Sequence, residues 1–123
     1  MTSSTLSGNA AVTGVGGGVF VFDSNLNSSF TIANSIVAGN TDDGTAPELL
    51  ADPDSTLTIN HSLIGSTDLT IVGTGNQVGT LADPIDPLLG PLADNGGPTE
   101  THALLAGRQS SDRCWRPDCG GRR

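Results

Sequence analysis

Positive charge is missing from most of this 123-residue chain. Residues 1–107 contain no Lys or Arg and 11 acidic residues, a net charge of −11, whereas all five Arg lie in residues 108–123. Proteins that bind nucleic acid neutralise its phosphates with Lys and Arg. The composition therefore excludes nucleic acid as a partner of the segment before Arg108.

Long apolar runs and aromatic residues are also scarce. No stretch reaches the roughly 18 apolar residues of a membrane-spanning helix, and Met1–Ala11 has neither the basic nor the apolar region of a signal peptide. We therefore expect no membrane insertion by this segment and no signal peptide in this chain. With no Tyr and only three Phe, the chain is not expected to offer an aromatic platform for stacking sugars.

A repeated pattern of short apolar pieces organises the residues that are present. Residues 16–41 (GGGVFVFDSNLNSSFTIANSIVAGNT) hold three β-rich pieces separated by polar residues. The second half of this pattern returns at residues 55–67 with an offset of 27, and residues 3–9 match residues 34–40 with an offset of 31. Periods of about 20 to 50 residues are typical of solenoids, in which each coil buries its apolar face by stacking on the next.

These repeats predict an all-β fold, a single-stranded parallel β-helix of about 3–4 coils over residues 1–82, with an irregular C-terminal tail. The pieces at 69–72 and 79–81 predict weaker strands at the end of the array, and residues 42–54 are expected to form the largest loop between coils. Residues 83–107 are rich in Pro and Gly. We expect a turn-rich terminal segment there, because Pro cannot donate to a central β-ladder.

The coil interior and the coil corners are expected to use different side chains. The predicted apolar stacks consist of alternate strand residues, namely Val19, Val21, Phe30, Ile32, Ile36, Leu57, Ile59 and Leu63. The expected corners contain recurring Asn residues, namely Asn34, Asn40 and Asn60. Stacked amides can hydrogen-bond along a solenoid and satisfy turn backbones, so a structural role is predicted for all three.

A calcium site is the one metal candidate that the sequence offers. Five acidic residues crowd the loop at 42–54, namely Asp42, Asp43, Glu48, Asp52 and Asp54. Oxygen ligands at such density can hold Ca²⁺, whereas Asp residues in a solvated loop commonly serve turns. Neither the EF-hand spacing nor a glycine-rich calcium-binding repeat occurs. We therefore expect no cofactor, with Ca²⁺ on the four Asp residues of this loop as the alternative.

Paired carboxylates of the kind that glycosidases use are present but lie in turn-like surroundings. Asp83 with Asp86 and Asp52 with Asp54 are each next to Pro, which favours structural roles. A lyase acting on an acidic polysaccharide needs a cation beside the substrate carboxylate, and residues 1–107 contain no Lys or Arg. No catalytic residue is therefore predicted.

The remaining reactive side chains also favour structural roles. His61 and Ser62 are neighbours in a strand pattern, so their side chains are expected on opposite faces rather than paired for catalysis. His102 lies in the terminal segment. Cys114 and Cys119 have neither a second cysteine pair nor a nearby His in sequence, so they do not form a zinc site.

Four segments carry a resemblance to a known family: GGGVFVF, NSIVAGNT, HSLIG and DPLLGPLADNGGPTETHALLAG. Over residues 3–107 the chain resembles bacterial surface proteins of the choice-of-anchor Q group, which are similar to polymorphic outer-membrane protein repeats. The resemblance implies a right-handed β-helix in a longer secreted parent, located extracellularly or at the cell surface, with its signal and anchor elsewhere. Because residues 1–9 match the end of a coil, Met1 is expected to start inside the repeat array.

The resemblance ends at Gly107, where the family continues with a sequence similar to GSPAIDAGD and this chain continues with RQSSDRCWR. Codons that encode Arg108–Arg116 can be chosen so that the next reading frame gives GNPAIDAGD. We therefore predict that the Arg-, Cys- and Trp-containing tail at 108–123 is a frameshift product and is disordered. A genuine basic tail is the alternative.

Three functional hypotheses follow from this sequence. The first is a non-catalytic structural or adhesin-like surface module whose partner is a polysaccharide or a host or cell-surface ligand. The second is a fragment of a carbohydrate-active β-helix enzyme, a polysaccharide hydrolase or lyase, and the third is a remnant without function. Open strand edges at the ends of a short array also predict self-association.

Overall fold

The computed structural model describes residues 1–12, 16–22, 29–42 and 47–105, and it divides the chain into two units, Met1–Pro87 and Leu88–Arg123. Every regular element of the described residues is a β-strand, and none of them forms a helix. The predicted all-β class is therefore confirmed. Accordingly, these residues contain no helix that could span a membrane. The predicted tail at 108–123, with both cysteines, lies outside the described residues.

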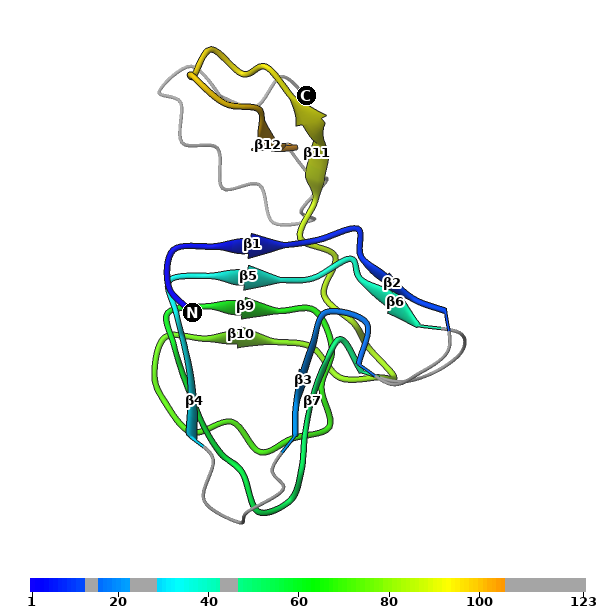
Figure 1. Cartoon of the computed structure of the whole chain (residues 1–123), viewed down its shortest axis with the longest axis vertical. Coiled ribbons are helices and arrows are strands. Elements are labelled where there is room, and N and C mark those ends of the chain that lie inside the picture. Colours follow the sequence, from blue (N-terminus) through cyan, green and yellow to red (C-terminus); the bar gives the residue numbers. More distant parts are fainter. Residues whose placement is uncertain (13–15, 23–28, 43–46, 106–123) are drawn as a thin grey trace, which may run out of the picture. The chain divides into compact units, whose positions relative to one another are not determined.

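Short parallel strands build the first unit. In chain order they are β1 (Thr5–Leu6), β2 (Ala10–Ala11), β3 (Val19–Val21), β4 (Ser29–Ala33), β5 (Ile36–Val37), β6 (Thr41–Asp42), β7 (Leu49–Ala51), β8 (Thr56–Asn60), β9 (Leu63–Ile64) and β10 (Gln77–Val78). One sheet has the order β1-β5-β9-β10, and the pairs β2-β6, β3-β7 and β4-β8 form the others (Figure 1). The strands β1–β4 make a first pass of the chain, β5–β8 a second, and β9 begins a shorter third that returns to β10.

The strand register follows the sequence repeats. Ile32 pairs with Ile59 and Ile36 with Leu63, both at the predicted offset of 27, and Thr5 pairs with Ile36 at the predicted offset of 31. The third pass is shorter than predicted, because Gln77 of β10 already pairs with Leu63 of β9, at about half the offset of the earlier passes. After β9 the chain runs directly along β7, where the N–H of Leu49 donates to the carbonyl of Ser66 at 3.3 Å.

The core lies between the sheets of this unit and consists of aliphatic side chains. Its fully buried members are Ile32, Val37, Leu49, Ile59 and Ile64, and Leu57 is 7% exposed. These side chains are branched aliphatic groups that pack well within narrow β-layers. Together they form one continuous apolar cluster.

Two predicted core residues were wrong. Ile36 and Leu63 are half-buried, whereas the residues after them, Val37 and Ile64, are fully buried. Each of these strands has only two residues, so one must point inward and the other outward. Repeat alignment fixes which residues pair across strands but leaves open which of the two faces the core.

The predicted strands beside the core also needed correction. The expected loop at 42–54 contains β7, which pairs in parallel with β3 and buries Leu49 completely. At 69–72 the described chain forms only an isolated bridge between Thr58 and Val72, and the strand expected at 79–81 is instead β10 at Gln77–Val78. Val19 and Phe30 are partly buried against the core, and Val21 is half-buried.

The second unit contains an antiparallel hairpin of β11 (Leu89–Ala93) and β12 (Thr101–Leu104), with an irregularity between Leu89 and Leu92. Its connection is fixed by Asn95, whose side-chain amide donates to the carbonyl of Thr101 at 2.7 Å. The Pro- and Gly-rich terminal segment therefore contains regular pairing as well as the expected turns. Pro91 is tolerated in β11 because it lies at the irregularity, where the ladder is interrupted.

Candidate functional site

A column of left-handed corners precedes the four-stranded sheet. Ser3, Asn34, His61 and Gly75 each lie two residues before β1, β5, β9 and β10, and their φ angles are 48°, 50°, 49° and 70°. A positive φ is uncommon for residues other than Gly, although Asn and His tolerate it better than most. The same backbone turn therefore starts the four-stranded sheet in every pass, and it sets the spacing of the side chains beside it.

A ladder of buried hydroxyls and one amide holds these corners in register. The backbone N–H of Ser4 donates to Oγ of Ser35 at 3.2 Å, that of Ser35 to Oγ of Ser62 at 3.1 Å, and that of Ser62 to Oδ1 of Asn76 at 3.1 Å. Ser35 and Ser62 are 3% and 5% exposed. Ser62 Oγ also donates to the carbonyl of Asn60 at 2.8 Å. This hydroxyl therefore stabilises the backbone of the corner.

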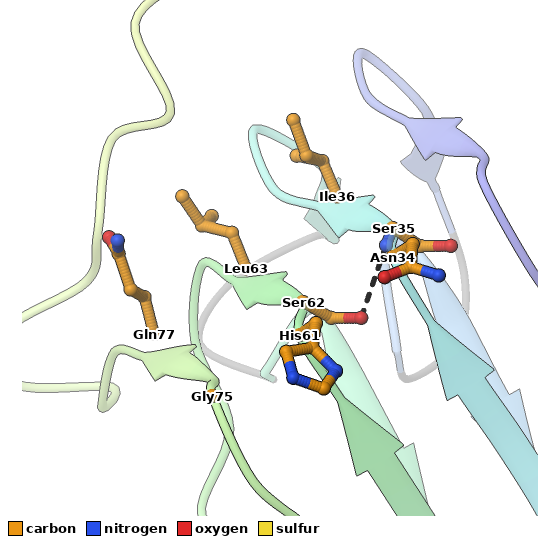
Figure 2. Close-up of a pocket in the computed structure, with 8 residues that line it drawn as sticks. All are labelled: Asn34, Ser35, Ile36, His61, Ser62, Leu63, Gly75 and Gln77. Atoms are coloured by element: carbon orange, nitrogen blue, oxygen red, sulfur yellow. Dashed lines mark hydrogen bonds between the residues drawn. The ribbon is translucent and has the colours of Figure 1, made fainter.

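A groove lies on the outer face of this sheet, beside the corner column. Figure 2 shows that Ile36, Leu63 and Gln77 project to the same side from the neighbouring strands β5, β9 and β10. Together with Asn34 and His61 they line an open cavity of about 370 Å³. This volume is within the range of about 300 to 1,000 Å³ that is common for small-molecule sites.

One wall of the groove depends on a glycine. The His61 ring lies against Gly75, where an added Cβ would be 2.6 Å from the ring Cδ2 atom. A side chain at position 75 would therefore displace the imidazole. The glycine lets His61 lie in the corner column between Asn34 and the last pass, with its ring at the groove surface (Figure 2).

The groove lining combines aliphatic surface with neutral polar groups. Ile36 and Leu63 supply the aliphatic part, and the amides of Asn34 and Gln77 each offer a donor and an acceptor. Within the described part of the chain, no hydrogen bond occupies either of these two amides. No carboxylate of the described residues lines the cavity. The surface is therefore suited to hydrogen-bonding a ligand and not to acid–base chemistry by paired carboxylates.

The acidic residues predicted as calcium ligands lie in separate local settings. Asp42 belongs to β6, Asp52 follows β7, and Asp54 is exposed after it, whereas Asp43 lies outside the described residues. Among the described positions, no three His, Cys, Asp or Glu side chains are grouped as a metal site would require. The geometry thus gives no support to calcium binding by these residues.

Glu48, the fifth acid of that loop, serves the fold instead. Its side chain is 8% exposed, and its Oε2 atom accepts from the backbone N–H of Asn40 at 3.2 Å and from Nδ2 of Asn40 at 3.1 Å. Asn40 also accepts from Asn9, through Oδ1, at 2.9 Å and donates to the carbonyl of Leu6 at 2.9 Å. The predicted corner role of Asn40 is therefore confirmed, with a buried acid as an additional partner.

The other predicted residues do not meet at a common site. Asp83 and Asp86 are exposed, and the N–H of Asp83 closes a local turn onto Thr80. Asn60 accepts from the backbone N–H of Thr74 at 3.1 Å, which is a corner contact of the predicted kind. His102 belongs to the second unit, where its Nδ1 atom lies 2.7 Å from the carbonyl oxygen of Gly90.

A second depression, of about 480 Å³, lies beside β3 and β7 and is lined by Phe20, Leu50 and Asp68, among others. Phe20 is 45% exposed and its ring lies 6.2 Å from that of Phe22, at an interplanar angle of 48°. The two rings are therefore tilted against each other and do not form one flat stacking surface, in agreement with the sparse aromatic content.

The groove was only partly visible in the sequence. The sequence predicts core positions for Ile36 and Leu63, a corner contact for Asn34 and no role for Gln77. The prediction for Asn34 is wrong, because its side-chain amide makes no hydrogen bond among the described residues. The informative signal is the recurrence of Ser3, Asn34 and His61 at the pairing offsets, because equivalent positions in stacked passes place their side chains in one column. No family model, curated protein or solved structure matches this chain.

Proposed function

We propose that unit 1 is a short right-handed parallel β-helix that acts as a non-catalytic, adhesin-like module, part of a larger bacterial protein at the cell surface. In this proposal the groove over β5, β9 and β10 is the face that contacts a polysaccharide or another cell-surface ligand. The resemblance to choice-of-anchor Q proteins supplies the expected extracellular setting.

The observation that carries the proposal is the repeated corner. The column of Ser3, Asn34, His61 and Gly75, backed by the serine ladder, repeats one structural unit along the stack. Such repetition presents equivalent side chains in rows on the outer surface. A row of neutral polar and aliphatic groups favours adhesion to an extended partner over the turnover of a small substrate.

A non-catalytic role is favoured by the chemistry of the groove. Among the residues that the structure describes, its lining contains no carboxylate, so they do not supply the two acids that glycosidases require. The Ser62 hydroxyl is held between the Ser35 N–H and the Asn60 carbonyl, which leaves it unsuited to act as a nucleophile beside His61.

The experiment uses beads that carry the full chain. We expect retention on polysaccharide-coated or cell-coated surfaces without release of reducing ends or unsaturated sugars into the medium. The Gln77→Ala variant should reduce retention, and Phe20→Ala, on the other depression, should leave it unchanged. Release of sugars that depends on the groove residues would instead identify an enzyme, and absence of retention on every surface would refute the adhesin-like role.

The proposed parent protein can be tested separately. The nucleotide sequence across codons 100 to 123 should continue in the shifted frame as GNPAIDAGD followed by a long coding stretch. A frame that holds through Arg123 in independent reads would make the basic tail genuine.

A further inference from the structure

We infer that the groove over β5, β9 and β10 recognises a neutral saccharide chain that runs along the stack, and that it rejects acidic polysaccharides. This inference rests on the proposed adhesin-like function and names the ligand class of the same groove. It is carried by the charge, the hydrogen-bonding groups and the spacing of the lining residues.

Charge excludes anionic ligands. Residues 1–107 hold 11 acids and no Lys or Arg, so no guanidinium or ammonium side chain within them can pair with a carboxylate or a sulfate on the ligand. A uronate chain would enter the negative field of the body without any compensating cation. Burying even part of such a charge without a partner is unfavourable, which leaves uncharged ligands.

The polar groups of the groove match sugar hydroxyls. A hydroxyl both donates and accepts, and so does each of the side-chain amides of Asn34 and Gln77. Within the described residues these two amides have no hydrogen-bond partner, so a ligand could occupy them without breaking an internal contact. The imidazole of His61 adds a third polar group to the same surface (Figure 2).

The aliphatic groups complete the match. Ile36 and Leu63 are partners in the β5-β9 register and are half-buried at the groove surface. Their methyl groups present an apolar strip that can cover the C–H faces of sugar rings. A site that mixes an apolar strip with a few oriented polar groups is the usual composition of small-molecule sites.

Spacing favours an oligosaccharide over a single sugar. Neighbouring strands lie about 4.8 Å apart, which is comparable to the length of one pyranose unit in an extended chain. Asn34 and His61 are one pass apart, as are Ile36 and Leu63, and Gln77 follows in the next pass. A chain of three or more sugars can therefore contact all of these residues at once, whereas a monosaccharide cannot.

The test measures binding of the full chain to cellohexaose, mannohexaose, xylohexaose and hexagalacturonate by isothermal titration calorimetry, with the corresponding monosaccharides as length controls. We expect at least one neutral hexasaccharide to bind, and hexagalacturonate and the monosaccharides not to bind at the same concentration. Gln77→Ala should weaken binding about tenfold, which corresponds to about 1.4 kcal/mol, near the upper end of what one hydrogen bond contributes.

The matched control is Thr31→Ala, which removes an exposed strand residue on β4, away from the groove. It should leave both folding and binding unchanged. Circular dichroism of each variant confirms that folding is retained. Binding of hexagalacturonate as tight as that of the neutral sugars would overturn the inference, as would absence of binding to all three neutral hexasaccharides or loss of binding in Phe20→Ala alone. Bead retention on cell-coated surfaces would then still support the adhesin-like function, so the two failures can be distinguished.

Discussion

The replacement Asn40→Asp tests whether the buried polar cluster around Asn40 holds the first two passes together. In the native structure, Nδ2 of Asn40 donates to the carbonyl of Leu6 at 2.9 Å and to Oε2 of Glu48 at 3.1 Å. The variant keeps the shape of the side chain but replaces this nitrogen by an oxygen. Two donated hydrogen bonds are lost, and two carboxyl groups then face each other in a site where Glu48 is 8% exposed.

The expected loss of stability can be built from these contacts. Each buried acceptor left without its donor costs about 1 to 3 kcal/mol, and an uncompensated buried charge adds to this sum. We therefore expect the free energy of unfolding at pH 7 to fall by about 3 to 5 kcal/mol. For a domain of this size such a loss is a large share of the total stability, about 5 to 15 kcal/mol.

The assay is urea unfolding followed by far-ultraviolet circular dichroism. The matched control is Asn34→Asp, the same replacement at an exposed corner, which should change stability by less than about 0.5 kcal/mol. An Asn40→Asp penalty no larger than that of the control would refute this account of the cluster.

Four further predictions concern the stability of the fold, and urea unfolding measures the first two. Ser62→Ala should cost about 1 to 3 kcal/mol because it leaves a buried backbone N–H unpaired. Ser55→Ala should be neutral or stabilising because the buried Ser55 hydroxyl has no hydrogen-bond partner among the described residues. Leu49→Ala should cost about 2 to 5 kcal/mol by leaving a cavity, and the half-buried Leu50 much less. Gly73→Ala should prevent folding, since its φ is 134° and a Cβ would overlap a carbonyl of the neighbouring strand; normal expression and stability would contradict this. Raising NaCl from about 0.02 to 0.5 M should raise the melting temperature by screening the acidic body, and a decrease would count against self-repulsion as the dominant charge effect.

Strand pairing was the most predictable part of the fold. The offset of 27 between Ile32 and Ile59 is the register of β4 and β8, and the offset of 31 is the register of β1 and β5. Stacked passes must align equivalent residues, so a repeat in the sequence carries the register directly. The short third pass was not visible, because the segment that returns from Leu63 to Gln77 shares no apolar pattern with the first two passes.

Side-chain direction was less predictable. Strands of two residues, such as β5 and β9, are too short for an alternating pattern to show which residue faces inward. Leu49 was missed because its apolar pair lies among Pro, Glu and Asp, residues that are typical of loops. The groove was not predicted for the same reason. With Ile36 and Leu63 predicted to face the core, the sequence indicated no row of outward-facing side chains on β5 and β9.

The inward-facing, corner and outward-facing positions of this unit have different structural roles, and these roles determine which surface can take part in the proposed binding. Inward residues such as Val37 and Ile64 fill the core, and the residues after each left-handed corner are committed to the serine ladder. Changing a residue of either set would destabilise the fold. The outward-facing residues Gln77 and Asn34 neither fill the core nor belong to the serine ladder, and their side chains make no internal hydrogen bond among the described residues. Gln77 can therefore change with little cost to stability, whereas position 34 needs a residue that tolerates a positive φ. Under the proposed function, the ligand preference of this unit can thus vary through the outer face of the β5-β9-β10 sheet while its fold stays the same.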